Sequence, residues 1–389
     1  MTLPVQTRMI AGAVLAASLV ALAGCAVNGE GGKKSSDTAA AKAVTTKGAE
    51  LRSWQIDGPA WGKVGYRLDW QGFPFAGVKT DGAIREVRPY GDTIVAQEKG
   101  STVTVMEAAT GANRWSGDIA NPLTKFVSVM RDPTDPSRLI ATSESDVYVM
   151  AMQTGNLLAR QKLARVVSNS PVSVGDTLVC GTAQGQVLSH NLVSGLPAWR
   201  FQSVGSIESN AVMVGGVVAM VSQAGDVVML DATSGSLIGR ARTFSGLSNN
   251  PVTDGTNVYI ASLDQSVWAF DVGGRTAWRY RTGAPIRSQP TVVGNMLVVE
   301  TESGLTALSA ADGSVLWKNK DLGGEVVATR KGDLVVFGGG AVKLVSAKKG
   351  DLIASAPAAG VKSVVTDTFA DGALYLVTEV NTIVKLLGN

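Results

Sequence analysis

The chain is poor in the residues that most enzyme and metal sites need. Its 389 residues include one histidine, His190, and two cysteines, Cys25 and Cys180. Zinc sites and catalysis by a Ser-His or Cys-His pair need at least one histidine among suitable partners. The sequence therefore argues against both kinds of chemistry, and we expect no metal site, no cofactor and no catalytic residue.

Strong net charge is also missing. Lysine and arginine number 35 against 32 aspartates and glutamates, which gives a formal net charge of +3 at pH 7. The sequence contains no long basic run and no aromatic motif of the RNA-binding type. We therefore expect no nucleic-acid partner.

One long apolar run is present, "MIAGAVLAASLVALAG" at residues 9–24. It is shorter than the roughly 20 residues of a membrane span, but it suits the core of a signal peptide. The run leads into "LAGC", residues 22–25, which resembles the lipobox of bacterial lipoproteins. We predict a signal peptide over residues 1–24 and acylation of Cys25, including palmitate, which would anchor the chain to a membrane. An ordinary secretory signal followed by an unrelated cysteine is the alternative.

The next residues predict the compartment and the tether. The residue after Cys25 is Ala26 and not aspartate, which resembles lipoproteins directed to the outer membrane. Residues 25–50 are small and polar, so we predict a flexible linker between the lipid and the folded domain. With Cys25 acylated, Cys180 has no partner for an intrachain disulfide. Its strand-like surroundings, "DTLVCGT", predict a buried structural thiol.

From residue 51 to residue 389 the chain repeats a unit of about 40 residues. Each unit has an apolar segment, a second apolar segment, a turn with glycine, and often a tryptophan four residues later, as in "LTALSAADGSVLW". The separations between successive turn glycines are 44, 40, 40, 39, 39 and 37 residues. These glycines are Gly111, Gly155, Gly195, Gly235, Gly274, Gly313 and Gly350.

The units contain short runs of Val, Leu and Ile with frequent turns and no helical period, which predicts an all-β fold. About 40 residues in four strands is the length of one β-propeller blade. The pattern resembles the PQQ-like (quinoprotein-type) propeller repeat, in which a turn glycine is followed by tryptophan. This resemblance implies that Gly111, Gly195, Gly274 and Gly313, with Trp115, Trp199, Trp278 and Trp317, are structural and cover the seams between blades.

The ends of the chain predict the number of blades. The last residues provide strands of an eighth unit without its final strand, and the segment around Trp70 provides a single strand near the start. Pairing the N-terminal strand with the C-terminal blade would remove two exposed sheet edges. We therefore predict one eight-bladed propeller over residues 51–389, with seven blades as the alternative.

The resemblance extends to enzymes and to proteins without catalytic activity. In quinoprotein dehydrogenases the cofactor stacks on a disulfide between adjacent cysteines, and this chain has no adjacent cysteine pair. The lipobox, tether and compact ring together resemble the BamB family of lipoproteins, which implies a scaffold in the assembly of outer-membrane β-barrel proteins. We expect a non-catalytic protein at the periplasmic face of the outer membrane, with envelope proteins as partners. A PQQ-dependent oxidoreductase or a small-ligand sensor is the alternative.

Three stretches are candidates for a partner or ligand surface. Residues 121–139 contain two Asp-Pro pairs and predict a turn-rich surface loop. The second stretch combines Arg275, Arg279, Arg281 and Arg287 with aromatic residues, as interfaces often do. The third is a set of polar residues before the first strands of several blades, which would face the centre of the ring and includes Asn169, Asn210, Asn250 and Gln289. Unselected loop variation, solvent-facing strand positions and water binding are the alternatives for the three stretches.

Overall fold

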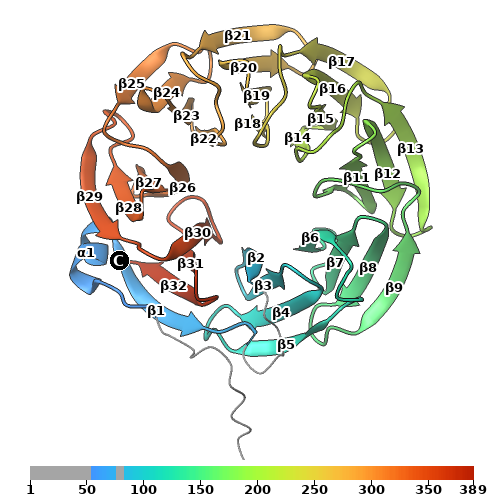
Figure 1. Ribbon diagram of the computed structural model, residues 1–389, viewed down its shortest axis with the longest axis horizontal. Helices are drawn as coiled ribbons and strands as arrows, with labels where there is room; N and C mark the ends of the chain where they lie inside the picture. The colour runs from blue at the N-terminus through green and yellow to red at the C-terminus, as the bar shows by residue number, and fades with distance from the viewer. Residues whose placement is uncertain (1–53, 76–82) are drawn as a thin grey trace, which may run out of the picture. The chain divides into compact units, whose positions relative to one another are not determined.

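The computed structural model describes residues 54–75 and 83–389, and these residues form an eight-bladed β-propeller. Each blade is a four-stranded antiparallel sheet, and the blades stand around a common centre in chain order (Figure 1). The prediction of an all-β propeller with eight blades is confirmed, and the alternative of seven blades is wrong. The predicted signal peptide, Cys25 and the linker lie outside the described residues.

In seven blades the strands follow one another along the chain, from an inner strand at the centre to an outer strand at the rim (Figure 1). Blade 1 consists of β2 (Ile84–Tyr90), β3 (Thr93–Glu98), β4 (Thr102–Glu107) and β5 (Asn113–Asp118), and blade 2 of β6 (Phe126–Arg131), β7 (Arg138–Ser143), β8 (Asp146–Ala151) and β9 (Leu157–Lys162). Blade 3 consists of β10 (Val172–Val174), β11 (Thr177–Gly181), β12 (Gln186–Asn191) and β13 (Leu196–Gln202). Blade 4 consists of β14 (Val212–Val214), β15 (Val217–Val221), β16 (Asp226–Asp231) and β17 (Leu237–Arg242). Blades 5 to 7 consist of β18 (Val252–Thr253), β19 (Asn257–Ser262), β20 (Ser266–Asp271) and β21 (Thr276–Arg281); β22 (Thr291–Val293), β23 (Met296–Thr301), β24 (Gly304–Ser309) and β25 (Val315–Asn319); and β26 (Glu325–Arg330), β27 (Asp333–Gly338), β28 (Ala341–Val345) and β29 (Leu352–Pro357).

Blade 8 contains strands from both ends of the described chain. Its first three strands are β30 (Val361–Thr366), β31 (Leu374–Thr378) and β32 (Ile383–Gly388), and its outer strand is β1 (Tyr66–Gly72), which pairs antiparallel with β32. Lys385 of β32 strengthens this junction, because its Nζ lies 3.1 Å from a carboxylate oxygen of Asp69 and donates to the carbonyl of Ala108 in blade 1 at 2.7 Å. The first strand and the last three strands of the propeller therefore belong to one sheet.

The hydrophobic core is divided among the seams between blades. Each of the eight seams has its own cluster of buried apolar side chains. The two middle strands of a blade are covered on both faces, so β4 and β8 are buried almost throughout, whereas the outer strand β9 is mostly exposed. Burial on both faces explains why these segments read as continuous apolar runs without alternation.

A short helix, α1 (Gly58–Val64), precedes β1 and packs against the outer strand β29 of blade 7 (Figure 1). Asp57 caps its N-terminus by accepting from the amide of Ala60, and Gly65 ends it with φ of 93°. Such a left-handed C-cap suits glycine, which has no Cβ. Within residues 54–75 and 83–389, no helix has the length and apolar composition of a membrane span.

Candidate interaction surface

Five tryptophans of the outer strands each reach the next blade. Each donates its indole N–H to a carbonyl in the neighbouring turn, over 2.8–3.2 Å. Each ring also covers the turn glycine, so closely that a Cβ on Gly313 would lie 2.5 Å from Trp278. These tryptophans are Trp70, Trp115, Trp199, Trp278 and Trp317, and the glycines under them are Gly111, Gly155, Gly235, Gly313 and Gly350.

The turns themselves are fixed by short polar side chains. The Oδ1 of Asn191 accepts from the amides of Val193 and Ser194, and Asp231 makes the same pair of bonds in the next blade. Asx turns of this kind satisfy backbone N–H groups without a second strand. Glu107 differs, because its carboxylate lies 2.7 Å from Nε of Arg114. Side chains used in this way are not free for acid-base chemistry.

Gly195 and Gly274 lie at seams that have no tryptophan. At Gly195 the cover is the side chain of Gln161, whose Nε2 donates to the carbonyl of Leu192 at 2.7 Å, where an indole N–H would donate elsewhere. Its Oε1 lies 2.8 Å from Nε2 of the buried His190. Sequence reasoning missed Gln161, although it lies two residues after the tryptophan position and so on the same face of the strand.

The histidine and the cysteine that the structure describes, His190 and Cys180, are both buried. Burial raises the pKa of the Cys180 thiol to about 12, so the thiol is protonated and unreactive at neutral pH. Burial also lowers the pKa of His190, which keeps its imidazole neutral. No group of three or more His, Cys, Asp or Glu suited to a metal occurs in the part of the chain that the structure describes.

The four arginines of the 275–287 stretch do not form one cluster. The Nε of Arg275 bonds to Asp271 at 2.8 Å within its own turn. Arg279 lies over the ring of Trp268, 4.2 Å from its centroid, and 5.0 Å from that of Phe244. Arg281 ends β21 and Arg287 lies in the connection to the inner strand, both exposed.

The polar residues before the inner strands mainly join neighbouring blades. The Oδ1 of Asn210 accepts from the amide of Ser170, and the Oδ1 of Asn250 accepts from the amide of Asn210. Asn250 in turn donates to Gln289 at 3.0 Å, which continues the chain of bonds across blades 3 to 6. Asn169 is buried and bonds to the backbone at Gly181 and Ser209. These bonds account for much of the polar capacity that a ligand would use.

The prediction of a surface loop over residues 121–139 is wrong for part of its length. Residues 126–131 form the inner strand β6, and Phe126 is fully buried. The extra length lies in the turn that follows, where Arg138 forms ion pairs with Asp132 at 2.8 Å and Asp135 at 3.1 Å. The Asp-Pro pairs therefore shape a tight turn that the arginine holds.

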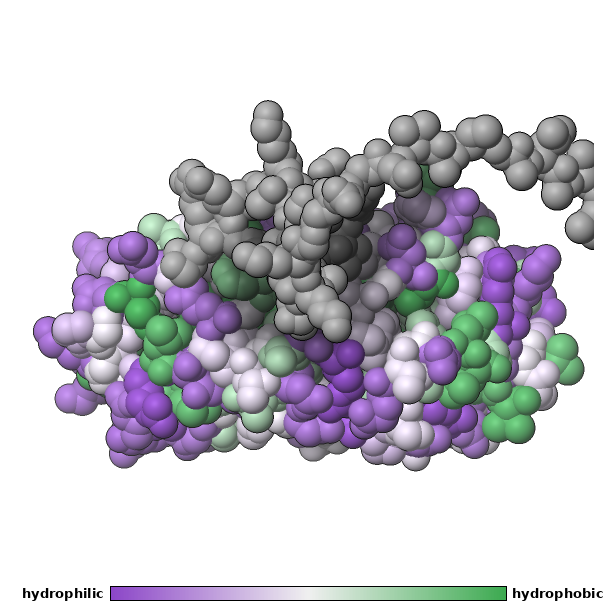
Figure 2. Space-filling model, turned by 90° about the horizontal axis from the view of Figure 1, so that it is seen from below, coloured by the Kyte–Doolittle hydropathy of each residue, from purple (hydrophilic) through white to green (hydrophobic). Residues whose placement is uncertain are grey.

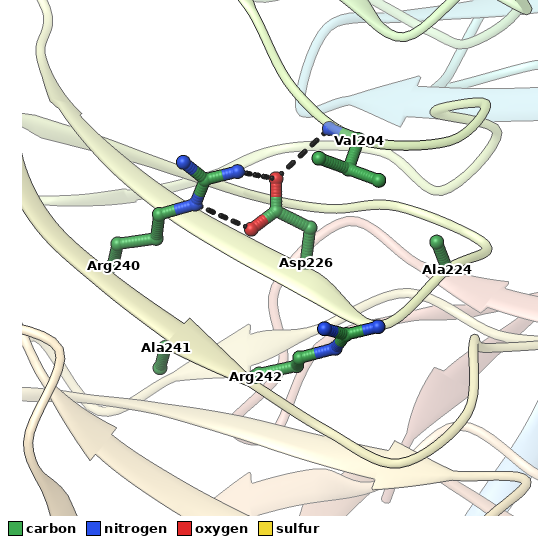
Figure 3. Close-up of a pocket in the computed structure, with 6 residues that line it drawn as sticks. All are labelled: Val204, Ala224, Asp226, Arg240, Ala241 and Arg242. Atoms are coloured by element: carbon green, nitrogen blue, oxygen red, sulfur yellow. Dashed lines mark hydrogen bonds and ion pairs between the residues drawn. The ribbon is translucent and has the colours of Figure 1, made fainter.

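A pocket of about 410 Å³ lies on the rim at blade 4, between β17 and the connection from blade 3 (Figure 3). Asp226 at its wall accepts from Nε of Arg240 at 2.7 Å and from the amide of Val204 at 3.0 Å. Burial would raise the pKa of Asp226, but these bonds and one from Ser203 outweigh it and lower the pKa. Arg242 lines the same pocket and makes no bond to the other residues drawn (Figure 3).

Exposed large apolar side chains recur at four successive connections between blades. They lie in the segments that connect the outer strand of one blade to the inner strand of the next, over blades 1 to 5. Among the corresponding connections of blades 5 to 8, the described residues include no exposed large apolar side chain. Because they recur at the same position of the repeat, we treat these residues as a candidate interaction surface. We call these four residues the apolar arc: Leu123, Val166, Val204 and Phe244.

Comparisons with known proteins agree with this architecture. Two curated relatives carry the name "Outer membrane protein assembly factor BamB". The one from Bordetella pertussis is 28% identical over 170 residues, which cover 42% of this chain and 42% of the relative. The one from Nitrosomonas eutropha is 31% identical over 103 residues, 26% of this chain and 25% of the relative. The matched segments thus span less than half of either relative.

Two solved structures share the fold. The crystal structure of BamB from Moraxella catarrhalis has a TM-score of 0.66 at 17% identity, covering 83% of this chain and 97% of that one. The computationally designed protein Ika8 has the same TM-score at 13% identity, covering 80% and 97%. The family model described as "Outer membrane protein assembly factor BamB" matches residues 99–246 and 224–382. The chain therefore belongs to the BamB family of PQQ-like β-propellers.

Proposed function

We propose that this chain is a lipid-anchored, non-catalytic scaffold of the bacterial cell envelope that acts in the assembly of outer-membrane β-barrel proteins. Cys25 carries the lipid, the residues up to 50 are the tether, and the ring is the domain that meets protein partners. The observation that carries the proposal is the family match over most of the ring, joined to the lipobox at residues 22–25.

The apolar arc is the surface that we assign to the protein partner. Phe244 is 76% exposed, and its amide donates to Asp264, so the loop that presents it is held in place. Val204 is fixed in the same way by Asp226. A loop already ordered in its free state loses less conformational entropy on binding. The arc therefore offers pre-formed apolar contacts at successive connections between blades.

The lipid anchor is tested first. A strain that expresses the full chain is labelled with radioactive palmitate and compared with Cys25→Ala. Label on the wild-type chain, none on the variant, and a shift of the wild-type chain to the membrane fraction would support the anchor. Equal release of both proteins from membranes would contradict it.

The partner surface is tested by site-specific crosslinking in cells. A photoreactive residue placed at Phe244 is compared with one at Val193, which is also 76% exposed but lies in a turn at the opposite end of an outer strand. The proposal expects crosslinks to the β-barrel assembly machinery from position 244 and few from position 193. Equal yields, or none from 244 in membranes that contain the machinery, would overturn the assignment.

A further inference from the structure

The charge on the rim of the ring is unevenly distributed. Five consecutive outer strands, β9, β13, β17, β21 and β25, carry arginine or lysine and no aspartate or glutamate. The other three outer strands differ. β5 contains Asp118, β1 contains Asp69, and β29 contains no charged residue and lies against α1. We call the five strands the basic rim.

Each strand of the basic rim has an exposed basic side chain near its end. Residues of the same strands are neutralised in some places, since Arg160 bonds to Asp146 and Arg240 to Asp226. The end positions, in contrast, form no ion pair within the described residues. They are Lys162, Arg200, Arg242, Arg281 and Lys318.

The same strands begin with exposed aliphatic residues. β9 begins with Leu157 and Leu158, β17 with Leu237 and Ile238, and β13 with Leu196, all between 45% and 62% exposed. β25 repeats the pattern, and β21 departs from it with small residues at these positions. The view in Figure 2 is from the side of β1 and β5, outside the basic rim, and there too exposed apolar residues lie among polar ones. Exposed aliphatic side chains therefore follow one edge of the basic rim, at the beginnings of the strands, and exposed basic side chains follow the other edge, at their ends.

We propose that the basic rim binds anionic phospholipid headgroups, so that the ring lies edge-on against a bilayer surface. Basic side chains near an anionic membrane are attracted to it, and neighbouring apolar side chains add affinity by entering the headgroup region. Because the rim is convex, a flat bilayer touches adjacent strands only. We place the centre of the contact at β13, β17 and β21, where Arg200, Arg242 and Arg281 are unpaired.

The pocket at blade 4 gives this surface a place for a phosphate group. Arg240 already neutralises Asp226, whereas Arg242 lines the pocket without an ion pair (Figure 3). The pocket therefore has one positive charge without an ion pair, beside the methyl groups of its wall, while the amide of Val204 is already bonded to Asp226. A headgroup phosphate at Arg242 would complete the arrangement.

The pattern favours a lipid surface over an acidic protein. A protein partner is recognised through a shaped, buried centre with a few dominant residues. Here the same combination of aliphatic and basic residues recurs on strand after strand, which fits a fluid surface of uniform chemistry. The basic rim lies on the outer strands and the apolar arc in the connections between blades, and the two surfaces meet at Val204, which also lines the pocket at blade 4.

The test uses residues 25–389 with Cys25→Ser, so that no lipid anchor contributes to binding. The protein is sedimented with vesicles of phosphatidylethanolamine and phosphatidylglycerol, and separately with vesicles of phosphatidylcholine. We expect binding to the anionic vesicles that weakens as salt is raised, because salt screens exposed charges. The triple variant Arg200→Gln, Arg242→Gln, Arg281→Gln should bind at least about tenfold more weakly, as three attractions to the anionic surface are lost.

Two further variants serve as controls. Lys331→Gln, Lys348→Gln, Lys349→Gln removes the same charge from exposed turns off the basic rim and should bind like the wild type. Replacing the three arginines by lysine should retain binding, which would show that charge and not folding is responsible. Equal losses in the two glutamine variants, equal binding to neutral vesicles, or binding of an acidic envelope protein with no affinity for anionic vesicles would overturn the proposal. None of these results depends on the crosslinks from Phe244, so the two proposals can fail separately.

Discussion

Five seams of the ring are closed by a tryptophan of an outer strand, and the seams between blades 2 and 3, 4 and 5, and 7 and 8 are closed without an outer-strand tryptophan. The tryptophan seams all use the same contact, an indole over the turn glycine with an N–H bond to a carbonyl. The other three seams are closed by contacts of other kinds. The comparison shows that close packing at a seam can be reached with different side chains, and that the bond to a carbonyl is replaced at the seam of Gln161.

The three exceptions replace the indole in distinct ways. Between blades 2 and 3 the side-chain amide of Gln161 donates to the carbonyl of Leu192. Between blades 4 and 5 the side chain is omitted, because Gly239 lets two backbones approach so closely that a Cβ would lie 2.4 Å from Gly273. Between blades 7 and 8 a tryptophan comes from outside the repeat, since Trp61 of α1 is fully buried in the cluster that contains Ala356 and Leu374.

The largest effect is expected at the seam that depends on α1. Trp61→Ala empties a fully buried site and should lower the free energy of unfolding by about 3–5 kcal/mol. Trp54→Ala, which loses a half-buried ring and its bond to Ala359, is the control and should cost less. Urea unfolding followed by fluorescence measures both. Similar losses in the two variants would mean that α1 does not close this seam.

The next effect concerns the glycine under a tryptophan. Gly313 has φ of 72° and lies under Trp278, so Gly313→Ala combines backbone strain with a clash and should cost roughly 2–4 kcal/mol. Gly294 has φ of 58° but no atom within 4 Å of an added Cβ. Gly294→Ala should therefore cost only about 1 kcal/mol. If the two alanine variants unfold at the same urea concentration, the tryptophan contact does not limit this position.

A smaller loss of stability is expected at the seam that Gln161 covers, between blades 2 and 3, and at a seam that a tryptophan covers, between blades 1 and 2. Gln161→Leu leaves both the carbonyl of Leu192 and the Nε2 of His190 without their partner, and should cost about 1–2 kcal/mol. Trp115→Phe removes the bond to the carbonyl of Met152 and part of the ring that covers Gly155, and should cost about 1 kcal/mol. Thermal unfolding of the two variants compares them directly. A larger loss in Trp115→Phe would reverse the order proposed here.

The smallest effect is a pH dependence of stability that comes from His190, at the seam between blades 2 and 3. The folded state lowers the pKa of His190, so the unfolded chain binds a proton more readily. The contribution of neutral His190 to the free energy of unfolding is fully present above the pKa of the unfolded chain, about 6.5, and is lost as the pH falls below that value. Between pH 7 and 5.5 the loss should reach at most about 1 kcal/mol. His190→Gln should flatten the profile in this range, and an unchanged slope would assign the dependence to other groups.

The repeat made the fold predictable from the sequence. Turn chemistry is local, so the glycines and the residues four positions later can be identified without knowledge of their neighbours. Gln161, Gly239 and Trp61 could not be found in this way, because their roles depend on contacts with other blades. The same limit applied to the candidate sites. Arg275 and Arg287 belong to one stretch of sequence, yet one is bound in its own turn and the other lies in a connection between blades.

Blade 8 has a consequence for the order in which a newly made chain can fold. β1 is made early, but its partner β32 is made more than 300 residues later, and the amide of Ile84 meets Asn381 across 297 residues. Until β32 has been made, β1 has no partner strand. Blade 1 also lacks blade 8, the neighbour that covers one of its two faces. The seams from blade 1 to blade 7 can form while synthesis continues, whereas the last two must wait. The ring thus completes only after nearly the whole chain has been made, so an unfinished chain presents open sheet edges on which other chains could pair.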